Sequence, residues 1–493
     1  MTEPVRQDVT IPVPDYFHDH HLEGQAVVPA VESMCVLADA AGERLGISGA
    51  CSVNAGFRRF FYVEPGAGAV EAVLELKQVE DGVHAMLGAG HTAQKTGITR
   101  VKDHVTLTFV EDLDVPVPPL ELACAAVGPA LAVDTESLYS EVVPFGPAFH
   151  NLRDTVYLTP DGVIATIVAP RYGPPCGALG SPFVFDAALH AACAWGQRYT
   201  GAVTFPVGYG MRKVFTPTEQ GSLYFCRIFP GEARGRMLTF DIYIYDEDGE
   251  LVEAICEVRM QDLFSGRMSP AEWVYEREPP DFSVIEDNCR AFLYMNNRCL
   301  MPFANKCLSP TERRRAEQRM PARRPQCASA RILIKQLVRE ELEVDASLHP
   351  REIETALEEE TCARCMVCGE ASEFHCTSAH AVRYTAAVLD DSPVGVHVER
   401  ATDRPLRRAQ AFLSSEEQNM CWDSPLGAVD AACRMWSLKK AAAKALGIPL
   451  VQSWAEVRVA RVREKHSLAE YGDLTLAAHH ALAHDHLFTL VKL

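Results

Sequence analysis

The 493-residue chain is longer than one hydrophobic core usually supports, so its length predicts two or three domains. Its 48% hydrophobic and 23% charged residues are typical of a globular protein that folds in water. A net charge of −19 argues against a nucleic-acid partner, because phosphate binding needs a basic face. No stretch approaches the roughly 18 apolar residues of a membrane helix, so no membrane partner is expected.

The start of the chain and its cysteines both bear on the cellular compartment. Residues 1–17 contain no basic stretch followed by an apolar run, the pattern of a secretory signal. The 17 cysteines, an odd number, are therefore expected to be reduced thiols. We predict a cytoplasmic location, with a disulfide framework as the alternative.

Residues 1–115 and 130–265 are predicted to form two similar units. Each contains one apolar stretch with helical spacing, from Pro29 to Gly46 and from Pro182 to Tyr199. Proline suits the first turn of a helix, where its missing N–H removes no hydrogen bond. The β-rich stretches are 69–76, 101–109, 238–245 and 251–260. A long helix wrapped by an antiparallel sheet, occurring twice, predicts an α+β double hot-dog fold over residues 1–265.

The residue composition indicates the nature of three further segments. Residues 112–120 are proline-rich and indicate a connector. Residues 266–300 have mixed charge and a Pro-Pro pair, and they are predicted to be an interdomain linker. Residues 301–493 contain further strands and helices and form the predicted last domain. Its basic run, 313–324, suits an acidic partner protein, and a solvated helix face explains it equally well.

The first candidate catalytic residue is His20, in the pattern His20-x3-Gly24-x4-Pro29. Histidine has the side-chain pKa closest to neutral pH, so it is suited to remove a proton from a carbon acid. Gly24 would let the backbone approach a thioester. A helix beginning after Pro29 would present free N–H groups to an enolate oxygen. A surface histidine in a histidine-rich loop is the alternative.

The second candidate is Asp186, followed by His190, within an otherwise apolar helix. Burial of a carboxylate is costly and raises its pKa, as a proton donor requires. The alternative is an aspartate that points to solvent or caps a turn.

These motifs, with Val142–Leu152 between them and Phe205–Val214 after them, resemble the dehydratase domains of modular polyketide synthases. That family has HxxxGxxxxP, GYGPxF-like and DxxxQ/H motifs in this order. Two positions depart from the family pattern: Phe145 replaces the tyrosine before Gly-Pro, and Ser181 replaces the histidine before Pro182. The first change removes a hydroxyl that would contact substrate.

The resemblance implies the loss of water from a 3-hydroxyacyl thioester without a metal or redox cofactor. His20 would remove the α-proton, Asp186 would protonate the β-hydroxyl, and His190 would orient either Asp186 or the hydroxyl. The substrate would be carried on the phosphopantetheine arm of an acyl carrier protein, with other synthase subunits as partners. The implied substrate-binding residues are Gly24, Pro29, Phe145, Gly146, Pro147 and Phe149.

The last domain resembles another family, the 4′-phosphopantetheinyl transferases, which are α+β proteins. The resembling segments are 308–319, 329–342, 377–381, 393–399, 407–417 and 436–447. The family binds Mg²⁺ through the aspartate of VGVDxE and the glutamate of KEA. Here His397 and Lys440 stand at those positions, and neither is a good ligand for Mg²⁺.

The resemblance therefore implies a degenerate transferase domain that is inactive as an enzyme. Coenzyme A remains a candidate ligand, with Arg331, His380, Glu399 and Lys444 as its implied binding residues. A separate weak metal signal is Cys362-x2-Cys365-x2-Cys368, whose spacing is typical of zinc or iron–sulfur sites. A chain generally rich in cysteine is the alternative explanation.

Two other functions remain open for the first domain. Product-template cyclases and some isomerases use a His–Asp pair in the same fold, and a scaffold that only binds carrier proteins is the non-enzymatic alternative. The absence of ketosynthase and carrier sequences is expected for either a separate subunit or an excised fragment of a larger synthase.

Overall fold

The computed structural model describes residues 4–92, 99–125, 130–233, 235–296, 299–342, 348–355 and 362–493. The chain forms two compact units. The first comprises Met1–Val117 and Leu131–Arg277, and the second comprises Pro118–Ala130 and Glu278–Leu493.

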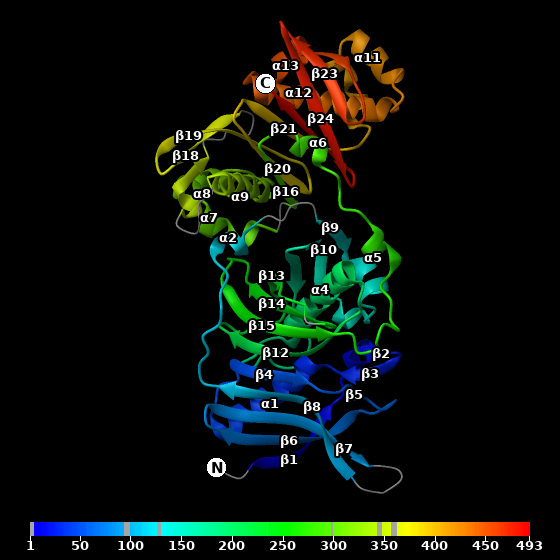
Figure 1. Ribbon diagram of the computed structural model, residues 1–493, viewed down its shortest axis with the longest axis vertical. Helices are drawn as coiled ribbons and strands as arrows, with labels where there is room; N and C mark the ends of the chain where they lie inside the picture. The colour runs from blue at the N-terminus through cyan, green and yellow to red at the C-terminus, as the bar shows by residue number, and fades with distance from the viewer. Residues whose placement is uncertain are drawn as a thin grey trace. The chain divides into compact units, whose positions relative to one another are not determined.

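The first unit is built on one 12-stranded antiparallel sheet (Figure 1). The predicted sheets of the two hot dogs join through β4 and β12, which pair antiparallel, so they are parts of one continuous sheet. All four predicted β-rich stretches are confirmed as strands β6, β8, β14 and β15. In sheet order the strands are β1 (Val5–Pro12), β6 (Ala69–Val79), β7 (Gly82–Thr92), β8 (Thr99–Val110), β4 (Cys51–Phe57), β12 (Phe205–Val214), β15 (Leu251–Gln261), β14 (Met237–Tyr245), β13 (Leu223–Pro230), β11 (Gly162–Val168), β10 (Leu152–Thr159) and β9 (Leu131–Asp134).

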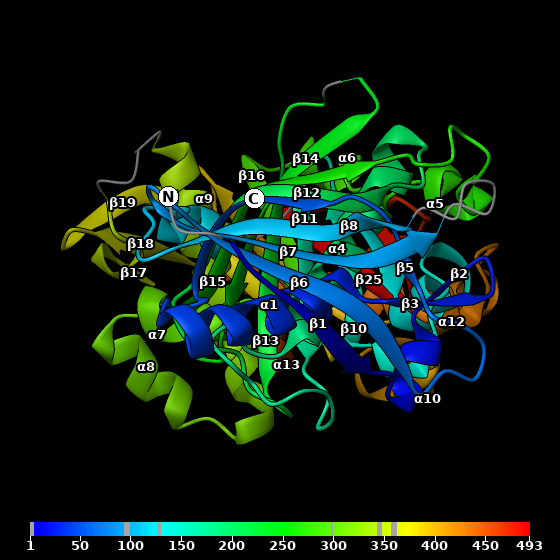
Figure 2. The ribbon, with the colours of Figure 1, turned by 90° about the horizontal axis from the view of Figure 1, so that it is seen from below.

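The two predicted helices are confirmed as α1 (Ala30–Leu45) and α4 (Pro182–Thr200). Helix α1 packs on β7 and β8, and α4 packs on β10 and β11 (Figures 1 and 2). Gly46 and Gly201 end the helices in the left-handed conformation, at φ 67° and 66°. Because α4 is apolar on nearly all sides, it forms the central helix of its half of the core. The double hot-dog fold is thereby confirmed.

Part of the segment predicted to be an interdomain linker, 266–300, is folded, whereas the predicted connector at 112–120 has no helix or strand before α2 begins at Leu120. Helix α5 (Glu272–Glu276) belongs to the first unit: Val274 is 1% exposed, and Arg198 Nη1 donates to its carbonyl oxygen (3.0 Å). Strand β16 (Ala291–Asn296) pairs with β20 in the second unit. Helix α2 (Leu120–Ala123) also belongs to the second unit, although it lies in the chain between the two hot dogs.

The second unit contains two five-stranded antiparallel sheets, each covered by a long helix. Helix α9 (Arg324–Glu341) packs on β19 and β20 of the first sheet, and α12 (Ala428–Leu446) packs on β21 and β25 of the second. The first sheet has the order β16, β20 (Tyr384–Asp390), β19 (Glu370–His380), β18 (Ala363–Val367), β17 (Ile353–Thr355). The second has the order β21 (Val394–Arg400), β25 (His486–Lys492), β24 (Leu474–Ala483), β23 (His466–Tyr471), β22 (Arg458–Arg461).

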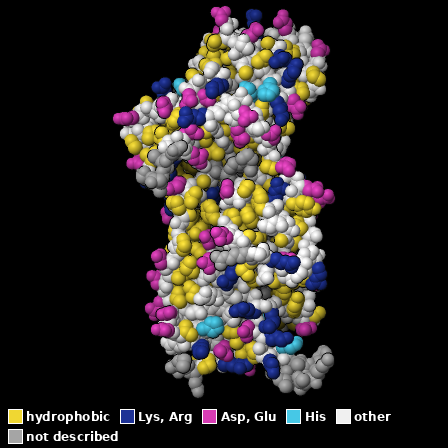
Figure 3. All heavy atoms as spheres, viewed as in Figure 1, with side chains coloured by type: hydrophobic (Ala, Val, Ile, Leu, Met, Phe, Trp, Pro, Cys, Tyr) yellow, Lys and Arg dark blue, Asp and Glu magenta, His cyan; other side chains and the backbone are white. Residues whose placement is uncertain are grey.

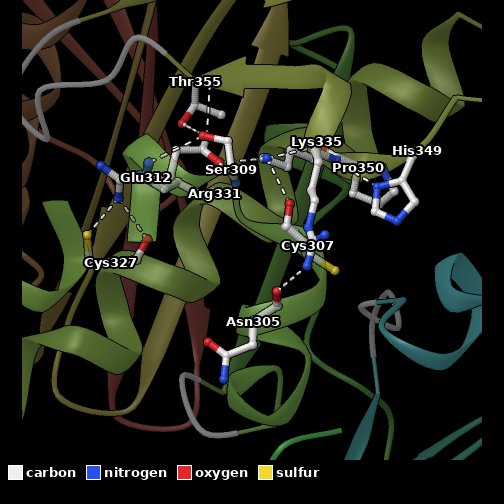
Figure 4. A network of polar contacts seen from close by, with 11 residues as sticks. Asn305, Cys307, Ser309, Glu312, Cys327, Arg331, Lys335, His349, Pro350 and Thr355 are labelled. Atoms are coloured by element: carbon white, nitrogen blue, oxygen red, sulfur yellow. Dashed lines mark hydrogen bonds and ion pairs between the residues drawn. The ribbon is translucent and has the colours of Figure 1, made fainter. Parts of the chain in front are cut away.

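A buried lysine anchors the first half of this unit (Figure 4). Helix α8 (Pro310–Glu317) begins with a capping box between Ser309 and Glu312. The Glu312 carboxylate lies 2.7 Å from Lys335 Nζ, which also donates to the carbonyls of Cys307 (2.9 Å) and Pro350 (2.8 Å). The ion pair thus joins the start of α8 to the middle of α9.

The second half repeats this arrangement. Helix α11 (Ser415–Trp422) begins with a capping box between Ser414 and Glu417. The Glu417 carboxylate accepts from Lys439 Nζ on α12 (3.0 Å), which also donates to the carbonyls of Phe412 (2.9 Å) and Trp454 (3.2 Å). Two halves that share a sheet, a long helix and the same buried ion pair form an internal structural repeat.

The surface charges, the helices and the cysteines were each compared with the sequence-based expectations. On the face shown in Figure 3, lysine and arginine side chains are interspersed with acidic ones in each unit. Among the described residues, no helix combines the length and the apolar character needed to cross a bilayer. All 17 cysteines are free thiols, as the sequence predicts.

Candidate active site

His20 lies where the chain leaves a short 3-10 helix, η1 (Asp15–Asp19), and enters the hairpin of β2 (His21–Leu22) and β3 (Gln25–Val28). The hairpin turn consists of Glu23 and Gly24, at φ 50° and 81°. A two-residue turn with both φ values positive matches the twist of the strands and favours glycine. The turn itself therefore explains Gly24, whereas the sequence analysis expected it to approach a thioester.

The ring of His20 is held in one tautomer. Its Nδ1 lies 3.0 Å from the carbonyl oxygen of Val27, which only accepts hydrogen bonds, so Nδ1 carries the proton in neutral His20. The lone pair of Nε2 is then available to accept a proton. Burial lowers the pKa of His20, although the charge of Asp186 opposes this effect. These two features suit His20 to act as a neutral base.

Asp186 and His190 lie one turn apart on α4, with 6% and 4% of their surfaces exposed. Asp186 Oδ2 is 3.0 Å from His190 Nε2. The two atoms are not aligned for a hydrogen bond, and neither has another hydrogen-bond partner in the described part of the chain. Buried polar atoms are almost always hydrogen-bonded in proteins. The pair therefore retains the capacity to bind a polar group of a ligand.

The pKa of Asp186 shifts opposite to the sequence-based expectation. Burial alone would raise it, but the charge of His190, its contact with the carboxyl, and the charge of His20 together lower the pKa below its ordinary value. The expectation of a raised pKa is therefore wrong for the ligand-free site. Only burial was predictable from the sequence, because His20 and His190 come close to Asp186 only in the fold.

Phe145 forms an aromatic wall beside both histidines. Its ring stacks on His20 with centroids 4.6 Å apart, and its centroid is 4.9 Å from that of His190. Phe149, at the end of η3 (Pro147–Phe149), is 1% exposed and lies 5.0 Å from the His20 ring. The site therefore has an apolar ring where the dehydratase pattern has a tyrosine.

Asp19 fixes the loop that carries Phe145. The N–H of Gly146 donates to the Asp19 carbonyl (2.7 Å), and the N–H of Ala148 donates to Asp19 Oδ2 (2.8 Å). A Cβ on Gly146 would lie 2.4 Å from the Asp19 carboxyl, so only glycine fits there. Because Asp19 precedes His20, the same residue positions the base and the aromatic wall.

Tyr139 is a site residue that sequence reasoning missed. It lies in a π-helical turn, η2 (Leu138–Val142), a feature often found at functional sites. Its hydroxyl oxygen accepts from the N–H of Leu152 (3.1 Å) and lies 3.5 Å from His190 Nδ1. A hydroxyl that donates to His190 Nδ1 leaves the proton of neutral His190 on Nε2, facing Asp186. No spacing motif marks this tyrosine.

We predict that Tyr139→Phe lowers kcat by about 3- to 10-fold and leaves KM unchanged, because one hydrogen bond to a positioning histidine is lost. The measurement is steady-state dehydration of a 3-hydroxyacyl thioester. Tyr275→Phe, at an exposed tyrosine on α5, is the matched control. A variant with wild-type kcat would show that Tyr139 does not position His190.

Glu32 is a second buried carboxyl in the first unit. It is 8% exposed on α1 and accepts a hydrogen bond from the Tyr16 hydroxyl (2.9 Å). Burial raises the pKa of Glu32 to about 7, the Tyr16 bond opposes this shift, and the charge of Asp186 adds to it.

Glu32 is therefore expected to make the first unit less stable as pH rises. The pKa of Glu32, about 7, exceeds its ordinary value of 4.5. The loss of stability therefore begins above pH 4.5 and is complete above about pH 7. The full shift corresponds to about 3 kcal/mol. We predict that Glu32→Gln removes this dependence and is more stable than wild type at pH 8 but not at pH 4, measured by urea unfolding. Glu43→Gln, at an exposed position on α1, should leave the dependence intact.

In the second unit, α12 and β21 bring four predicted residues together. A Cβ on Gly395 would lie 1.9 Å from the carbonyl oxygen of Ala441, so this glycine lets the helix pack closely on the strand. Glu399 Oε2 lies 3.4 Å from His397 Nε2 and 3.8 Å from Lys440 Nζ. Lys444 Nζ donates to the carbonyl of Ser378 on β19 (2.6 Å).

These residues do not fit Mg²⁺. Glu399 is the one carboxylate of the group, and the Lys440 ammonium lies beside it. Burial lowers the pKa of His397 to about 3, so its ring is neutral, and imidazole is a poor ligand for Mg²⁺. A hard divalent cation needs several oxygen ligands, and an ammonium beside the only carboxylate repels it.

Two residues expected to bind coenzyme A have different surroundings. Arg331 is 3% exposed, and its Nη1 donates to the carbonyl of Cys327 within α9 (2.9 Å), while its role at a phosphate stays a prediction. It was selected from the resemblance of this helix to the transferase family, which does not show that the guanidinium is buried. His380 is the last residue of β19. In the same strand, the carbonyl oxygen of Ser378 accepts a hydrogen bond from Lys444 Nζ.

The three spaced cysteines do not converge. Cys362 Sγ lies 3.8 Å from His375 Nδ1, Cys365 Sγ lies 3.1 Å from Cys376 Sγ, and Cys368 is exposed in a turn. Strand β18 separates them, because successive side chains of a strand point to opposite faces. Within the described ranges, no group of three or more histidine, cysteine, aspartate or glutamate side chains is arranged to hold a metal ion.

Comparison with family models matches residues 120–269 to the polyketide synthase dehydratase N-terminal domain, and 393–490 to the 4′-phosphopantetheinyl transferase superfamily. The chain carries segments of both families. Both resemblances are thereby confirmed, in the predicted order. Asp186 lies within the dehydratase segment and Glu399 within the transferase segment, whereas His20 precedes both.

Solved structures similar to the first half of the chain include three from polyketide synthases. The dehydratase domain from the CurJ module of curacin polyketide synthase is 15% identical, with a TM-score of 0.43 over 53% of this chain and 92% of that one. The dehydratase domain of PpsC from Mycobacterium tuberculosis, in complex with C12:1-CoA, is 19% identical, with a TM-score of 0.41. The match covers 53% of this chain and 94% of that one. A trans-acyltransferase polyketide synthase enoyl-isomerase is 13% identical, with a TM-score of 0.37. The match covers 52% of this chain and 98% of that one. No curated protein sequence matches the chain.

Proposed function

We propose that the first unit removes water from 3-hydroxyacyl thioesters carried on a phosphopantetheine arm. The observation that carries this proposal is the pairing of His20, held with a free Nε2 lone pair, with the buried Asp186 of the other hot dog. Elimination of water requires a base for the α-proton and an acid for the β-hydroxyl.

In the proposed reaction, His20 Nε2 takes the α-proton of the thioester. The Asp186 carboxyl gives its proton to the β-hydroxyl as the C–O bond breaks, and the new double bond forms between the α- and β-carbons. Water leaves, His20 is protonated and Asp186 is a carboxylate. A proton then returns from His20 to Asp186, so the pair holds one proton before and after each turnover.

The low pKa of Asp186 in the ligand-free site is compatible with its role as a proton donor when substrate is bound. In the ligand-free site both pKa values are below their ordinary values, which favours neutral His20 beside an Asp186 carboxylate. An acyl chain that displaces water lowers the local dielectric and makes charges costly. Substrate binding is thus expected to favour the neutral pair, neutral His20 with protonated Asp186, which is the reactive form.

The proposed partner is an acyl carrier protein, because a phosphopantetheine arm delivers the thioester in synthases of this kind. The test is mass spectrometry of a series of 3-hydroxyacyl-carrier proteins of increasing chain length, incubated with the full chain. The expected result is the loss of one water, with an α,β-double bond seen by NMR. Ring closure or a β,γ-double bond would instead indicate a cyclase or an isomerase. Unchanged substrates at every length would refute the proposal.

For the second unit, we propose that its transferase-like fold does not transfer phosphopantetheine. The support is the donor set at Glu399, where Lys440 replaces an acidic ligand. The test incubates an apo-carrier protein with coenzyme A, Mg²⁺ and the full chain. We expect no mass increase, and clear formation of the holo-carrier would refute the proposal.

A further inference from the structure

Two cysteines of the second unit, Cys124 and Cys307, have their sulfur atoms in contact. Cys124 directly follows α2, in the segment that lies in the chain between the two hot dogs, and Cys307 ends α7 (Ala304–Cys307). The Cys307 thiol donates to the sulfur of Cys124, and the two sulfur atoms are 3.6 Å apart. A disulfide has an S–S length of about 2.0 Å, so rotation of the two side chains is expected to bring the sulfurs to bonding distance.

A cavity of about 240 Å³ lies beside this pair. Its lining includes both cysteines, together with Lys335 and Arg339 of α9. Cys124 is 6% exposed and Cys307 is 0% exposed. A small oxidant that enters the cavity is therefore expected to meet the sulfur of Cys124 first.

The surroundings give the two sulfurs different roles. The carbonyl of Cys307 accepts from Lys335 Nζ (2.9 Å), which fixes Cys307 in place (Figure 4). The contact with Cys124 and burial raise the pKa of the Cys307 thiol, and the charges of Lys335 and Arg339 oppose this shift. Cys307 thus remains the thiol that donates, and its S–H stabilises negative charge on the sulfur of Cys124. Because a thiolate is the form that attacks an oxidant, Cys124 is suited to react first.

We propose that Cys124 and Cys307 form a reversible disulfide when the protein meets hydrogen peroxide. The Cys124 thiolate attacks one peroxide oxygen and breaks the O–O bond, which gives a sulfenic acid on Cys124 and, after uptake of a proton, water. The sulfur of Cys307 then attacks the sulfur of Cys124, the S–O bond breaks, and the Cys307 proton leaves with a second water. Two thiols are oxidised by two electrons and one peroxide is reduced to two waters. A dithiol reductant reverses the bond.

The disulfide would add a covalent bond to a short segment. Helix α2 has four residues, so its own hydrogen bonds stabilise it little. Glu121 of α2 lies 3.6 Å from Arg339 of α9, and the new bond would reinforce this ion pair. It would join positions 183 residues apart in the chain. Because residues 118–130 connect the two hot dogs, oxidation would restrain the connector of the first unit.

The first test treats the full chain with hydrogen peroxide, alkylates the remaining thiols and maps the disulfides by mass spectrometry. We expect a pair of peptides that is joined through Cys124 and Cys307 and that dithiothreitol separates. Cys124→Ser and Cys307→Ala should each abolish this pair of peptides. Cys176→Ser, at an exposed cysteine, is the matched control and should leave it unchanged. Circular dichroism checks that each variant is folded.

Cys365 and Cys376 provide a comparison within the same protein. Their sulfur atoms are closer, 3.1 Å apart, but the two residues are only 1% and 0% exposed. Distance alone predicts that this pair is oxidised first, whereas access from the cavity predicts that Cys124 and Cys307 are. We expect the bond between Cys124 and Cys307 to form at least about tenfold faster, because buried thiols are inert.

The second test measures hydrogen exchange of peptides from residues 118–125 in the reduced and the oxidised full chain. Oxidation should slow exchange there by about tenfold or more, because the bond suppresses local opening. The same treatment should not change exchange in Cys124→Ser. Neither test requires the first unit to remove water, so the outcome does not depend on the proposed function.

Three results would each overturn the proposal. In the first, Cys124 and Cys307 remain thiols under conditions that oxidise the exposed Cys176. In the second, the more buried comparison pair is joined before them. In the third, the disulfide forms but the exchange of residues 118–125 is the same in the reduced and oxidised states.

Discussion

Replacing His20 with alanine is expected to lower the rate of water loss by about 10²–10⁴-fold, the usual contribution of one positioned acid–base group. The reason is geometric: the Val27 carbonyl holds the proton of His20 on Nδ1, and removing the ring removes the Nε2 lone pair that would accept the α-proton. The measurement is the single-turnover rate with a 3-hydroxyacyl-carrier protein. Asp186→Asn should produce a loss of the same order, because an amide cannot supply the proton.

His18→Ala is the matched control for this experiment, because it changes an exposed histidine two residues away. It should leave the rate unchanged, and circular dichroism should show that all three variants are folded. A His20→Ala variant with the wild-type rate would mean that another group removes the α-proton. If the wild type itself shows no water loss, the proposed function fails before the role of His20 is tested.

Replacing Lys335 with methionine is expected to destabilise the second unit by about 3–5 kcal/mol, as is typical when one partner of a buried ion pair is removed. Lys335 and Glu312 have side chains that are 1% and 3% exposed, so the remaining carboxylate would stay buried without its cation. The carbonyls of Cys307 and Pro350 would also lose their donor. Hydrogen exchange of peptides from α9, followed by mass spectrometry, measures the loss locally.

The double variant Lys335→Met with Glu312→Gln is the control for the charge. It should recover part of the lost stability, because no unpaired charge remains buried. Replacing the equivalent lysine of the other half, Lys439, should cause a similar loss of stability, centred on α12. Equal stability of Lys335→Met and wild type would show that the ion pair contributes nothing to this unit.

Much of the fold follows from local sequence pattern. The helices at Ala30–Leu45 and Pro182–Thr200 were predictable because apolar periodicity, a leading proline and a closing glycine are local properties of the chain. Four strands of the two hot dogs, β6, β8, β14 and β15, were also predicted from their local sequence. His20 and Asp186 were found from ordered motifs, since each motif combines a reactive residue with the turn or helix that presents it.

The folded elements within residues 266–300 were not predicted, because their structure depends on distant partners. Residues 266–300 have a linker composition, yet Val274 is buried against α4 and β16 pairs with β20. Burial against another element stabilises a short helix or edge strand that has little local preference of its own. Composition therefore did not reveal where the first unit ends.

Sequence alone determined the two family resemblances, the central helices and the acid–base candidates, because each depends on residue types at short spacing. Tertiary structure decided the rest: the hydroxyl of Tyr139 beside His190, the lowered pKa of Asp186, the burial of Arg331 and the ammonium of Lys440 beside Glu399. These features arise between residues far apart in the chain. Hydrogen bonds and charge interactions act over a few ångströms in space, and sequence distance does not predict that separation.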